Sequence, residues 1–362
     1  MEPETPREAP RYVALVDLDA FYASVEMLED SSLEGKPLLI GGSPQARGVV
    51  AAASYAARKF GCHSAMPMSR ALRLCPEAVV LPPRFTLYHD YSQQVMDVLR
   101  RESALVQPMS IDEAYVDLTP VADSMAEAEG LAHRMQGRIR VDLGLPASVG
   151  LAPNKLVAKV ACETGKPQGF VVVRVGEEPG FLAPLPVKAL PGIGPRSEQR
   201  LLASGFGTLG QVAEASMESV MAALGPWGAV LQRRARGEDF SQVSTDRETK
   251  SISAEETFAQ DLTDEGALRD EVTRLAGRVA ASLDKHGLVT RTVTLKLRDA
   301  GFQTITRSHS REQSTAAAAA IANEALRLLM ANWVAGEPVR LIGVGTSNLR
   351  PVHAPGQLMM GI

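Results

Sequence analysis

The feature that most constrains this chain is a pair of acidic clusters, each at the edge of a short apolar run. Asp17-Leu18-Asp19 ends the run Tyr12-Val13-Ala14-Leu15-Val16, and Ser110-Ile111-Asp112-Glu113 precedes Ala114-Tyr115-Val116. Short apolar runs of this kind are typical of buried strands. If the two strands are neighbours in one sheet, the carboxylates of Asp17, Asp112 and Glu113 converge on one small volume.

Three carboxylates that lie so close cannot all stay ionised without cations, because each anion raises the pKa of the others. Hard divalent ions with oxygen ligands, Mg²⁺ first, meet this need. Two such ions on shared carboxylates can promote in-line displacement at phosphorus. The alternative is that Asp17 and Asp112 only cap helices or turns. That alternative is equally good for either cluster alone, but both clusters together favour a site for two Mg²⁺ ions.

Composition sets the frame without deciding the function. The 362 residues suffice for two or more domains, and 45% hydrophobic with 22% charged residues is ordinary for a soluble protein. No apolar run approaches a membrane span, the start of the chain is not a signal peptide, and the three cysteines have no metal-ligand spacing. We therefore expect a cytoplasmic protein with no membrane partner. The net charge of −4 gives no hint of nucleic acid, which would have to bind to local basic patches.

The C-terminal third has the clearest element order. Residues 184–240 read as helical, and the Ser-, Thr- and charge-rich stretch 241–250 reads as a linker. Beyond it, the pattern predicts strands at 252–258, 292–297, 302–306 and 339–344 and helices at 265–285 and 314–333. The order βαββαβ is the ferredoxin-like split, with both helices on one face of the sheet and the other face free for a partner.

Further residues of the sequence indicate sites that bind phosphate groups. Arg58 and Lys166 carry donors suited to a triphosphate, although a lone basic residue is usually a solvated surface charge. Tyr22 follows the first acidic cluster and would form an aromatic wall beside the metals, whereas its neighbour Phe21 fits helix packing. The stretch Leu190-Pro-Gly-Ile-Gly-Pro-Arg196 has the helix-hairpin-helix pattern, which binds nucleic-acid backbone at a helix N-terminus.

Over nearly its whole length the chain resembles the Y-family translesion DNA polymerases of the DinB (DNA polymerase IV) type. The matching stretches are 16–26, 55–61, 110–115, 154–155 with 165–167, 190–196 and 250–253. The resemblance implies an α/β (α+β) right-hand polymerase with a ferredoxin-like palm. Its segments would be the palm at 11–20 and 85–175, fingers at 21–84, a helix-hairpin-helix thumb at 176–241, a linker at 242–250, a βαββαβ little finger at 251–350 and a tail at 351–362.

The resemblance also implies roles for single residues. Asp17, Asp112 and Glu113, with the carbonyl of Leu18, would hold two Mg²⁺ ions, and Asp19 would point elsewhere. Deoxynucleoside triphosphates would be clamped by Tyr55, Arg58 and Lys166, with Tyr22 as a steric gate against ribose. Primer-template DNA would be held by Gly192, Gly194, Arg196, Lys250, Arg291, Lys296, Arg298 and Arg307, the last five on one strand face. Synthesis would be of low fidelity and without proofreading.

Two departures and one addition accompany the resemblance. The little finger is close to charge-balanced because of its acidic helices, so DNA binding is expected to depend on the basic residues of its strand face. Relatives often carry Thr where this chain has Ala52, so a donor to the triphosphate is missing and nucleotide affinity is expected to be lower. The end of the chain resembles a peptide that binds the bacterial sliding clamp; the alternative is a frayed apolar terminus. The residues of this peptide would be Gln357, Leu358, Met359, Met360 and Ile362. We expect the protein to be a monomer.

Two rival functions can be weighed against a polymerase. A non-catalytic DNA- and clamp-binding scaffold of the same fold would be marked by loss of a metal carboxylate, and all three are present. A nucleotidyl cyclase on a similar palm has no use for the hairpin, the linker or the C-terminal sheet. The sequence therefore favours a DNA-directed DNA polymerase.

Overall fold

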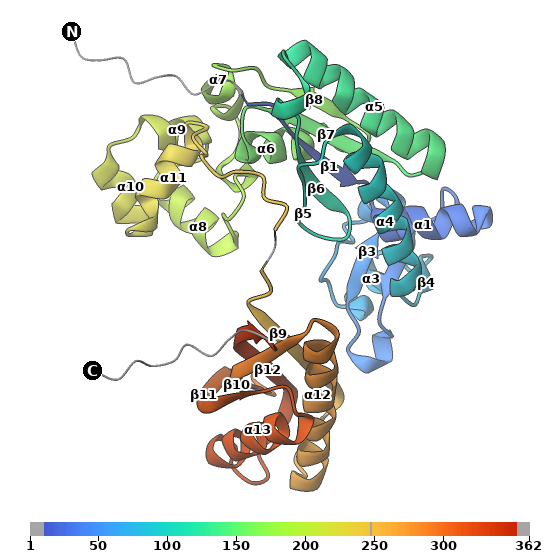
Figure 1. Cartoon of the computed structure of the whole chain (residues 1–362), viewed down its shortest axis with the longest axis vertical. Coiled ribbons are helices and arrows are strands. Elements are labelled where there is room, and N and C mark those ends of the chain that lie inside the picture. Colours follow the sequence, from blue (N-terminus) through green and yellow to red (C-terminus); the bar gives the residue numbers. More distant parts are fainter. Residues whose placement is uncertain (1–10, 247, 353–362) are drawn as a thin grey trace. The chain divides into compact units, whose positions relative to one another are not determined.

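The computed structural model describes residues 11–246 and 248–352, and the chain divides into two compact units (Figure 1). The first unit holds most of residues 11–246. The second holds residues 248–352, together with the short segments 42–49 and 67–70. Among the helices of the described residues, none is long and apolar enough to cross a membrane.

A five-stranded sheet is the centre of the first unit. Its order is β5 (Val106–Pro108), β6 (Glu113–Asp117), β1 (Val13–Leu18), β7 (Ala147–Ala152) and β8 (Phe170–Val172). β1 is antiparallel to both β6 and β7 and is buried along its whole length. A strand with neighbours on both sides and helices on both faces must be apolar throughout, which explains the continuous apolar run of the sequence.

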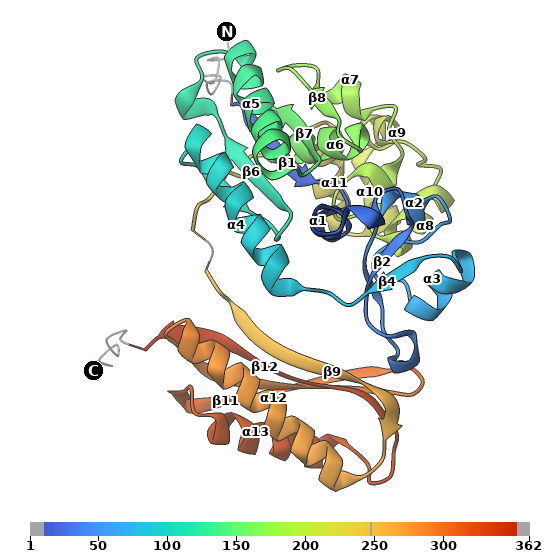
Figure 2. The ribbon, with the colours of Figure 1, turned by 90° about the vertical axis from the view of Figure 1, so that its right-hand side faces the viewer.

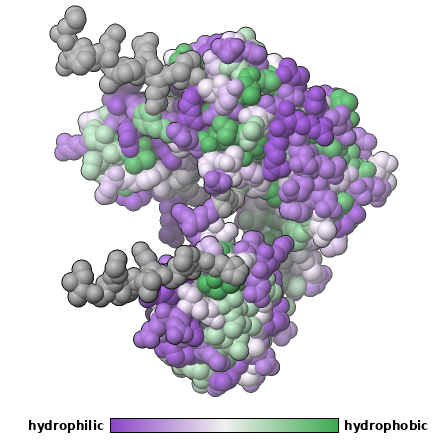
Figure 3. Space-filling model, in the orientation of Figure 1, coloured by the Kyte–Doolittle hydropathy of each residue, from purple (hydrophilic) through white to green (hydrophobic). Residues whose placement is uncertain are grey.

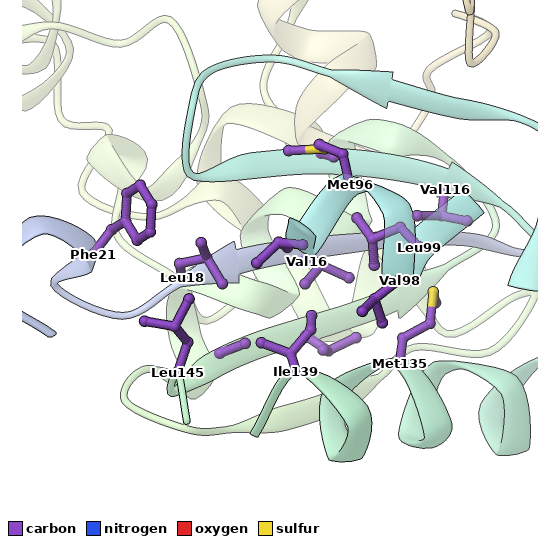
Figure 4. Packing of buried hydrophobic residues seen from close by; sticks show 14 of the residues in the cluster. Val16, Leu18, Phe21, Met96, Val98, Leu99, Val116, Met135, Ile139 and Leu145 are labelled. Carbon is purple, nitrogen blue, oxygen red and sulfur yellow. The ribbon is translucent and has the colours of Figure 1, made fainter. Parts of the chain in front are cut away.

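Helices cover both faces of this sheet. α4 (Phe85–Glu102) and α5 (Met125–Leu143) pack on one face, and α6 (Lys155–Gly165) packs on the other (Figure 2). Side chains alternate along a strand, so Val16 and Leu18 point towards α4 and α5, as Figure 4 shows, while Val13 and Leu15 join the core beneath α6. By the same alternation Asp17 lies on the α6 face.

A small second sheet follows β1 in the chain. Its order is β3 (Val50–Ala53), β2 (Leu38–Gly41) and β4 (Val79–Leu81), with β2 antiparallel to β3 and parallel to β4. Three short helices accompany it: α1 (Phe21–Glu29), α2 (Tyr55–Arg58) and α3 (Met68–Leu74).

The region after β8 is helical, as the sequence predicts for 184–240. It contains α7 (Glu178–Leu182), α8 (Pro195–Ala203), α9 (Leu209–Glu214), α10 (Met217–Leu224) and α11 (Trp227–Ala235). The side chains of this region share a core with α6 and with Val13 and Leu15 of β1.

The predicted βαββαβ order of the C-terminal third is confirmed. It reads β9 (Ser251–Leu262), α12 (Glu265–Lys285), β10 (Leu288–Asp299), β11 (Thr304–Thr315), α13 (Ala318–Asn332) and β12 (Val339–Pro351), in the sheet order β11-β10-β12-β9. The strands are longer than the apolar pattern predicts: β9 and β10 extend at both ends, whereas β11 begins two residues later than predicted and, like β12, extends only at its C-terminal end.

Both helices of this C-terminal sheet lie on one face, and Val293, Leu295 and Leu297 pack beneath them (Figure 2). Among the helices of residues 248–352, none packs on the opposite face, which we call the open face. Figure 3 shows hydrophilic side chains over much of the visible surface, interrupted by small hydrophobic patches. The large apolar side chains are thus mainly in the cores of the two units.

Candidate active site

The two acidic clusters meet at one end of β1 and β6. Asp17 is the register partner of Glu113, and the N–H of Leu18 donates to the carbonyl of Asp112 at 2.9 Å. Directly opposed residues of an antiparallel pair share a face, so Asp17 and Glu113 both lie on the α6 side of the sheet. The convergence expected from the sequence is therefore a consequence of strand pairing.

A cavity of about 350 Å³ opens beside these strands, and we call it the catalytic cavity. It gathers seven of the residues singled out from the sequence, and Ala52 also lines it. The seven are Asp17, Leu18, Tyr22, Tyr55, Arg58, Asp112 and Lys166.

A tight turn connects β1 to the aromatic wall of the cavity. Ala20 has φ 48°, in the left-handed region that L-residues rarely adopt. This turn reverses the chain into α1, so Tyr22 lines the same cavity as Asp17. The ring of Tyr22 stacks on Tyr88 with centroids 4.2 Å apart, and Phe85 approaches it edge-on. Tyr22 is therefore supported by other rings, whereas Phe21 packs in the core, as expected (Figure 4).

Asp17 carries its charge at a substantial electrostatic cost. It is 7% exposed, and burial raises its pKa to about 6, although the ammonium group of Lys166, 2.8 Å away, acts in the opposite direction. Burial by itself would lower the pKa of Lys166, but hydrogen bonds to Asp17 and Glu163 raise it above the usual value. Lys166 is therefore charged and supplies the positive charge that Asp17 needs.

A second lysine, Lys159, forms an ion pair with Glu113, and the sequence did not single it out. Lys159 Nζ lies 2.6 Å from Glu113 Oε2, and Lys155 Nζ lies 2.8 Å from Gln107 Oε1 one turn earlier on α6. Residues four apart share a helix face, so one polar stripe of α6 runs along β5 and β6. The four-residue spacing from Lys155 to Lys159 is visible in the sequence, but its meaning depends on knowing which face of α6 meets the sheet.

Asp112 and Glu113 point to different partners in this structure. Asp112 accepts a hydrogen bond from the hydroxyl of Ser110, while Glu113 turns to Lys159 and does not line the catalytic cavity. Within residues 11–246 and 248–352, no three acidic, His or Cys side chains are already grouped as a metal site. The pairing of β1 with β6 places Asp17, Asp112 and Glu113 close together along the chain backbone. The side chains of Asp112 and Glu113 nevertheless turn to Ser110 and Lys159 in this structure.

Tyr55 and Arg58, both on α2, also line the cavity. Ser54 caps this helix, and its hydroxyl accepts from the N–H of Ala57. The guanidinium group of Arg58 lies 4.8 Å from the ring centroid of Tyr55, and its Nε donates to the carbonyl of Ala53. The hydroxyl of Tyr55 donates to Asp19, which does not line the cavity. Arg58 therefore keeps terminal nitrogens for an anion.

The hairpin at 190–196 has one glycine that the backbone requires. Gly192 has φ 96°, while Gly194 has φ −86° and begins α8 as its N-cap without a side-chain acceptor. Arg196 follows in the exposed first turn. The uncapped N–H groups of a helix N-terminus favour anions.

The basic residues of the C-terminal sheet do not all share one face, which corrects the expectation from the sequence. Lys296 and Arg298 alternate with buried Leu295 and Leu297 and lie on the open face. Arg307 is the register partner of Leu295, so it lies on the helix face, where it donates to Asn332 at the end of α13. The bulge between Thr290 and Thr292 leaves Arg291 exposed, donating to the carbonyl of Arg311. Lys250, directly before β9, is exposed. The sequence could not predict the register of β11, which decides the face of Arg307.

Comparison with known proteins gives consistent matches. Residues 16–163 match the impB/mucB/samB family, and residues 249–360 match the C-terminal domain of that family. DNA polymerase IV of Halorhodospira halophila is 42% identical over 94% of this chain and 96% of its own length. DNA polymerase IV of Methanoculleus marisnigri is also 42% identical, over 94% of both chains.

Solved structures agree with these matches. A Y-family DNA polymerase chimera of Dbh and Dpo4 is similar with a TM-score of 0.85 and 25% identity, over 94% of this chain and 99% of its own. An insertion ternary complex of Dbh DNA polymerase is similar with a TM-score of 0.69 at 25% identity, with the same coverage.

Proposed function

This chain belongs to the impB/mucB/samB family and is a DNA-directed DNA polymerase of the Y-family type, and on that premise we propose that it performs low-fidelity translesion synthesis by two-metal nucleotidyl transfer, without proofreading. The observation that supports the proposal is the catalytic cavity, where two of the proposed metal ligands, Asp17 and Asp112, and the proposed triphosphate ligands Tyr55, Arg58 and Lys166 line one space. Low fidelity is supported by the small second sheet and its short helices, which leave little surface to enclose a base pair.

The residues at the end of β1 fit a pair of divalent ions. Asp17, Asp112 and Glu113 offer hard oxygen ligands, and the carbonyl of Leu18 would add a fourth. Two lysine ammonium groups already lie against Asp17 and Glu113, so this end of the sheet holds positive charge even without metal. When bound, two Mg²⁺ ions would activate the primer 3′-hydroxyl and stabilise the charge on the departing pyrophosphate.

Tyr55, Arg58 and Lys166 would bind the incoming triphosphate. Arg58 has a planar fork for phosphate oxygens, and Lys166 can exchange its bond to Asp17 for one to a phosphate when metal neutralises Asp17. Tyr22 would exclude a ribose 2′-hydroxyl, and its stacking on Tyr88 is what keeps its ring from moving aside. Ala52, which lines the cavity, contributes no hydroxyl to this clamp.

The duplex would be held mainly through its phosphates. Gly192, Gly194 and Arg196 would bind backbone at the N-terminus of α8. Lys250, Arg291, Lys296 and Arg298 would do so on the C-terminal sheet, whereas the helix-face position of Arg307 gives no support for a contact from the open face. The palm, fingers, thumb and little-finger boundaries given above are part of this proposal.

The remaining proposals concern partners and place. The expected sliding-clamp peptide, Gln357, Leu358, Met359, Met360 and Ile362, lies outside the described residues, so its support is the sequence alone. A monomeric state and a cytoplasmic location remain predictions from the sequence.

Mg²⁺-dependent extension of a labelled primer-template, with the wild-type chain compared with Asp112→Asn, tests the proposal. Loss of one metal ligand should lower extension by roughly a thousandfold, the effect of several kcal/mol of lost transition-state stabilisation. Asp142→Asn, an exposed change at the end of α5, is the matched control and should extend like the wild type. Duplex binding without extension in the wild type would instead indicate the scaffold role.

A further inference from the structure

Asp19 is a buried carboxylate that the proposed metal site does not use. It is 2% exposed and makes four contacts with neutral donors. Oδ1 accepts from the hydroxyl of Tyr55 at 2.9 Å, and Oδ2 accepts from the N–H of Gln168 at 2.8 Å. The hydroxyl of Ser148 lies between the two oxygens, at 3.1 and 2.9 Å. A buried anion is costly unless it is well hydrogen-bonded, so this arrangement calls for a reason.

The donors to Asp19 come from segments that are far apart in the chain. Tyr55 begins α2, and Gln168 lies two residues after Lys166 in the loop between α6 and β8. Tyr55 and Lys166 both line the catalytic cavity. Asp19 thus connects the two segments that would bind a triphosphate, although it does not line the cavity itself.

The loop that carries Lys166 needs such an anchor. Gln168 has φ 54°, a conformation that costs an L-residue about 1 kcal/mol. Next to it, a Cβ on Gly169 would come within 1.9 Å of the carbonyl oxygen of Gly165. Hydrogen bonds from Gln168 N to Asp19 and from Gly169 N to Ser148 hold this conformation. Without the acceptor on Asp19, the loop would relax and Lys166 would move with it.

The hydrogen-bond pattern requires a carboxylate rather than an amide. Both oxygens of Asp19 accept, one from Tyr55 and the other from a backbone N–H that cannot reverse its role. An asparagine has only one accepting oxygen. In an Asp19→Asn variant, one of these two contacts must therefore be lost or turned around.

We propose that Asp19 is a positioning residue for the incoming nucleotide: its carboxylate fixes Tyr55 and the Lys166 loop together, at the spacing that a triphosphate needs. The inference rests on the proposed role of Tyr55 and Lys166 in binding that triphosphate. It assigns Asp19 no contact with metal or substrate. The expected signature is therefore weaker nucleotide binding with chemistry largely preserved.

The experiment compares wild type, Asp19→Asn, Tyr55→Phe and the double variant in single-nucleotide insertion. Loss of one charge-assisted hydrogen bond should raise KM for the nucleotide about tenfold, with kcat changed less than about threefold. Because Asp19 acts partly through Tyr55, the double variant should be less impaired than the product of the two single effects. Nucleotide affinity, measured at equilibrium on a primer that lacks its 3′-hydroxyl, should fall in parallel without any turnover.

Each outcome decides the proposal. A wild type that does not extend primers overturns the proposed function and leaves Asp19 with no nucleotide to position. A wild type that extends, with unchanged KM in Asp19→Asn, overturns only the role of Asp19; so does a loss confined to kcat. If Asp19→Asn does not fold, as judged by thermal melting and primer-template binding, Ser148→Ala takes its place. That variant removes one donor to Asp19 outside the cavity, and an unchanged KM would again overturn the proposal.

Discussion

The same kind of ion pair occurs in two environments in this molecule. In the catalytic cavity, Lys166 Nζ lies 2.8 Å from Asp17, while on the open face of the C-terminal sheet Lys296 Nζ lies 2.7 Å from Glu255. The side chains of the first pair are 21% and 10% exposed, and those of the second 33% and 51%. Equal distances therefore do not mean equal energies, because solvent screens the exposed pair and not the buried carboxylate.

This difference has a functional meaning. The buried carboxylate of Asp17 is stabilised in its charged form by a cation, so under the proposed function metal would have to replace Lys166 as its partner rather than leave it unpaired. An exposed pair such as Lys296–Glu255 can open at little cost, so the sheet can release its lysine to a phosphate. Under the proposed function, metal would replace Lys166 as the partner of Asp17 in the catalytic cavity, whereas the open face would make a weak, salt-dependent contact with phosphates.

Among the variants that test this comparison, the largest effect is expected at Lys166. Lys166→Met removes both the partner of Asp17 and a proposed phosphate ligand, so insertion efficiency should fall roughly a hundredfold, as for the loss of a strong charged hydrogen bond. Most of the loss should be in KM, measured by single-nucleotide kinetics. Lys166→Arg keeps the charge and serves as the control. Full activity in Lys166→Met would mean that the buried pair matters no more than an exposed one.

Tyr22 tests whether the cavity wall is as rigid as its aromatic stacking indicates. Tyr22→Ala opens the space next to the sugar and should reduce selection of deoxy- over ribonucleotides about fiftyfold, a normal range for discrimination by pocket shape. Tyr22→Phe keeps the ring and should keep the selectivity. The ratio of kcat/KM for the two nucleotides is the measurement, and an unchanged ratio in Tyr22→Ala would remove the gate assignment.

The ion pair between Lys159 and Glu113, next to the cavity, extends the comparison. In Lys159→Met, Glu113 loses its ammonium partner and becomes a stronger ligand for a divalent ion. The Mg²⁺ concentration for half-maximal activity should therefore decrease about threefold, the scale of a partly exposed ion pair. Lys155→Met, which removes a lysine one turn earlier that pairs with neutral Gln107, is the matched control and should leave this concentration unchanged. A higher Mg²⁺ requirement in Lys159→Met would show that the lysine helps rather than competes.

Periodicity predicted the βαββαβ order of the C-terminal sheet, whereas the fold class of the whole chain was predicted through the resemblance. The buried run at 12–16 and the alternation at 292–297 define strands by themselves, and the βαββαβ order follows. The sequence also selected seven of the residues that line the catalytic cavity, through the resemblance and through the position of carboxylates at strand ends, although Glu113 does not line it. These features depend on neighbours along the chain.

What the sequence could not give depends on neighbours in space. The face of Arg307 follows from the pairing of β11 with β10, and the partner of Glu113 follows from the orientation of α6 on the sheet. The contacts of Asp19 join three segments that no local pattern connects. A one-residue change of register would reverse the first of these, so only the folded structure decides them.

The last test of the comparison is at Glu255, where the expected effect is as small as that at Lys159 and is confined to low salt. Glu255→Gln frees Lys296 on the open face, so affinity for primer-template should rise about threefold at low salt, the scale of one exposed pair. The gain in affinity should disappear at high salt, because salt screens the phosphates. The affinity of Glu255→Gln should therefore depend more steeply on salt than that of the wild type. Glu265→Gln removes an equal charge from the first turn of α12, on the helix side of the sheet, and should change affinity less. Fluorescence anisotropy over a salt series measures both variants. If both variants gain the same affinity for primer-template, the change in net charge alone is responsible. If Glu255→Gln binds more weakly than the wild type, the ion pair holds Lys296 in the position in which it binds DNA. The open face would then be as ordered as the catalytic cavity.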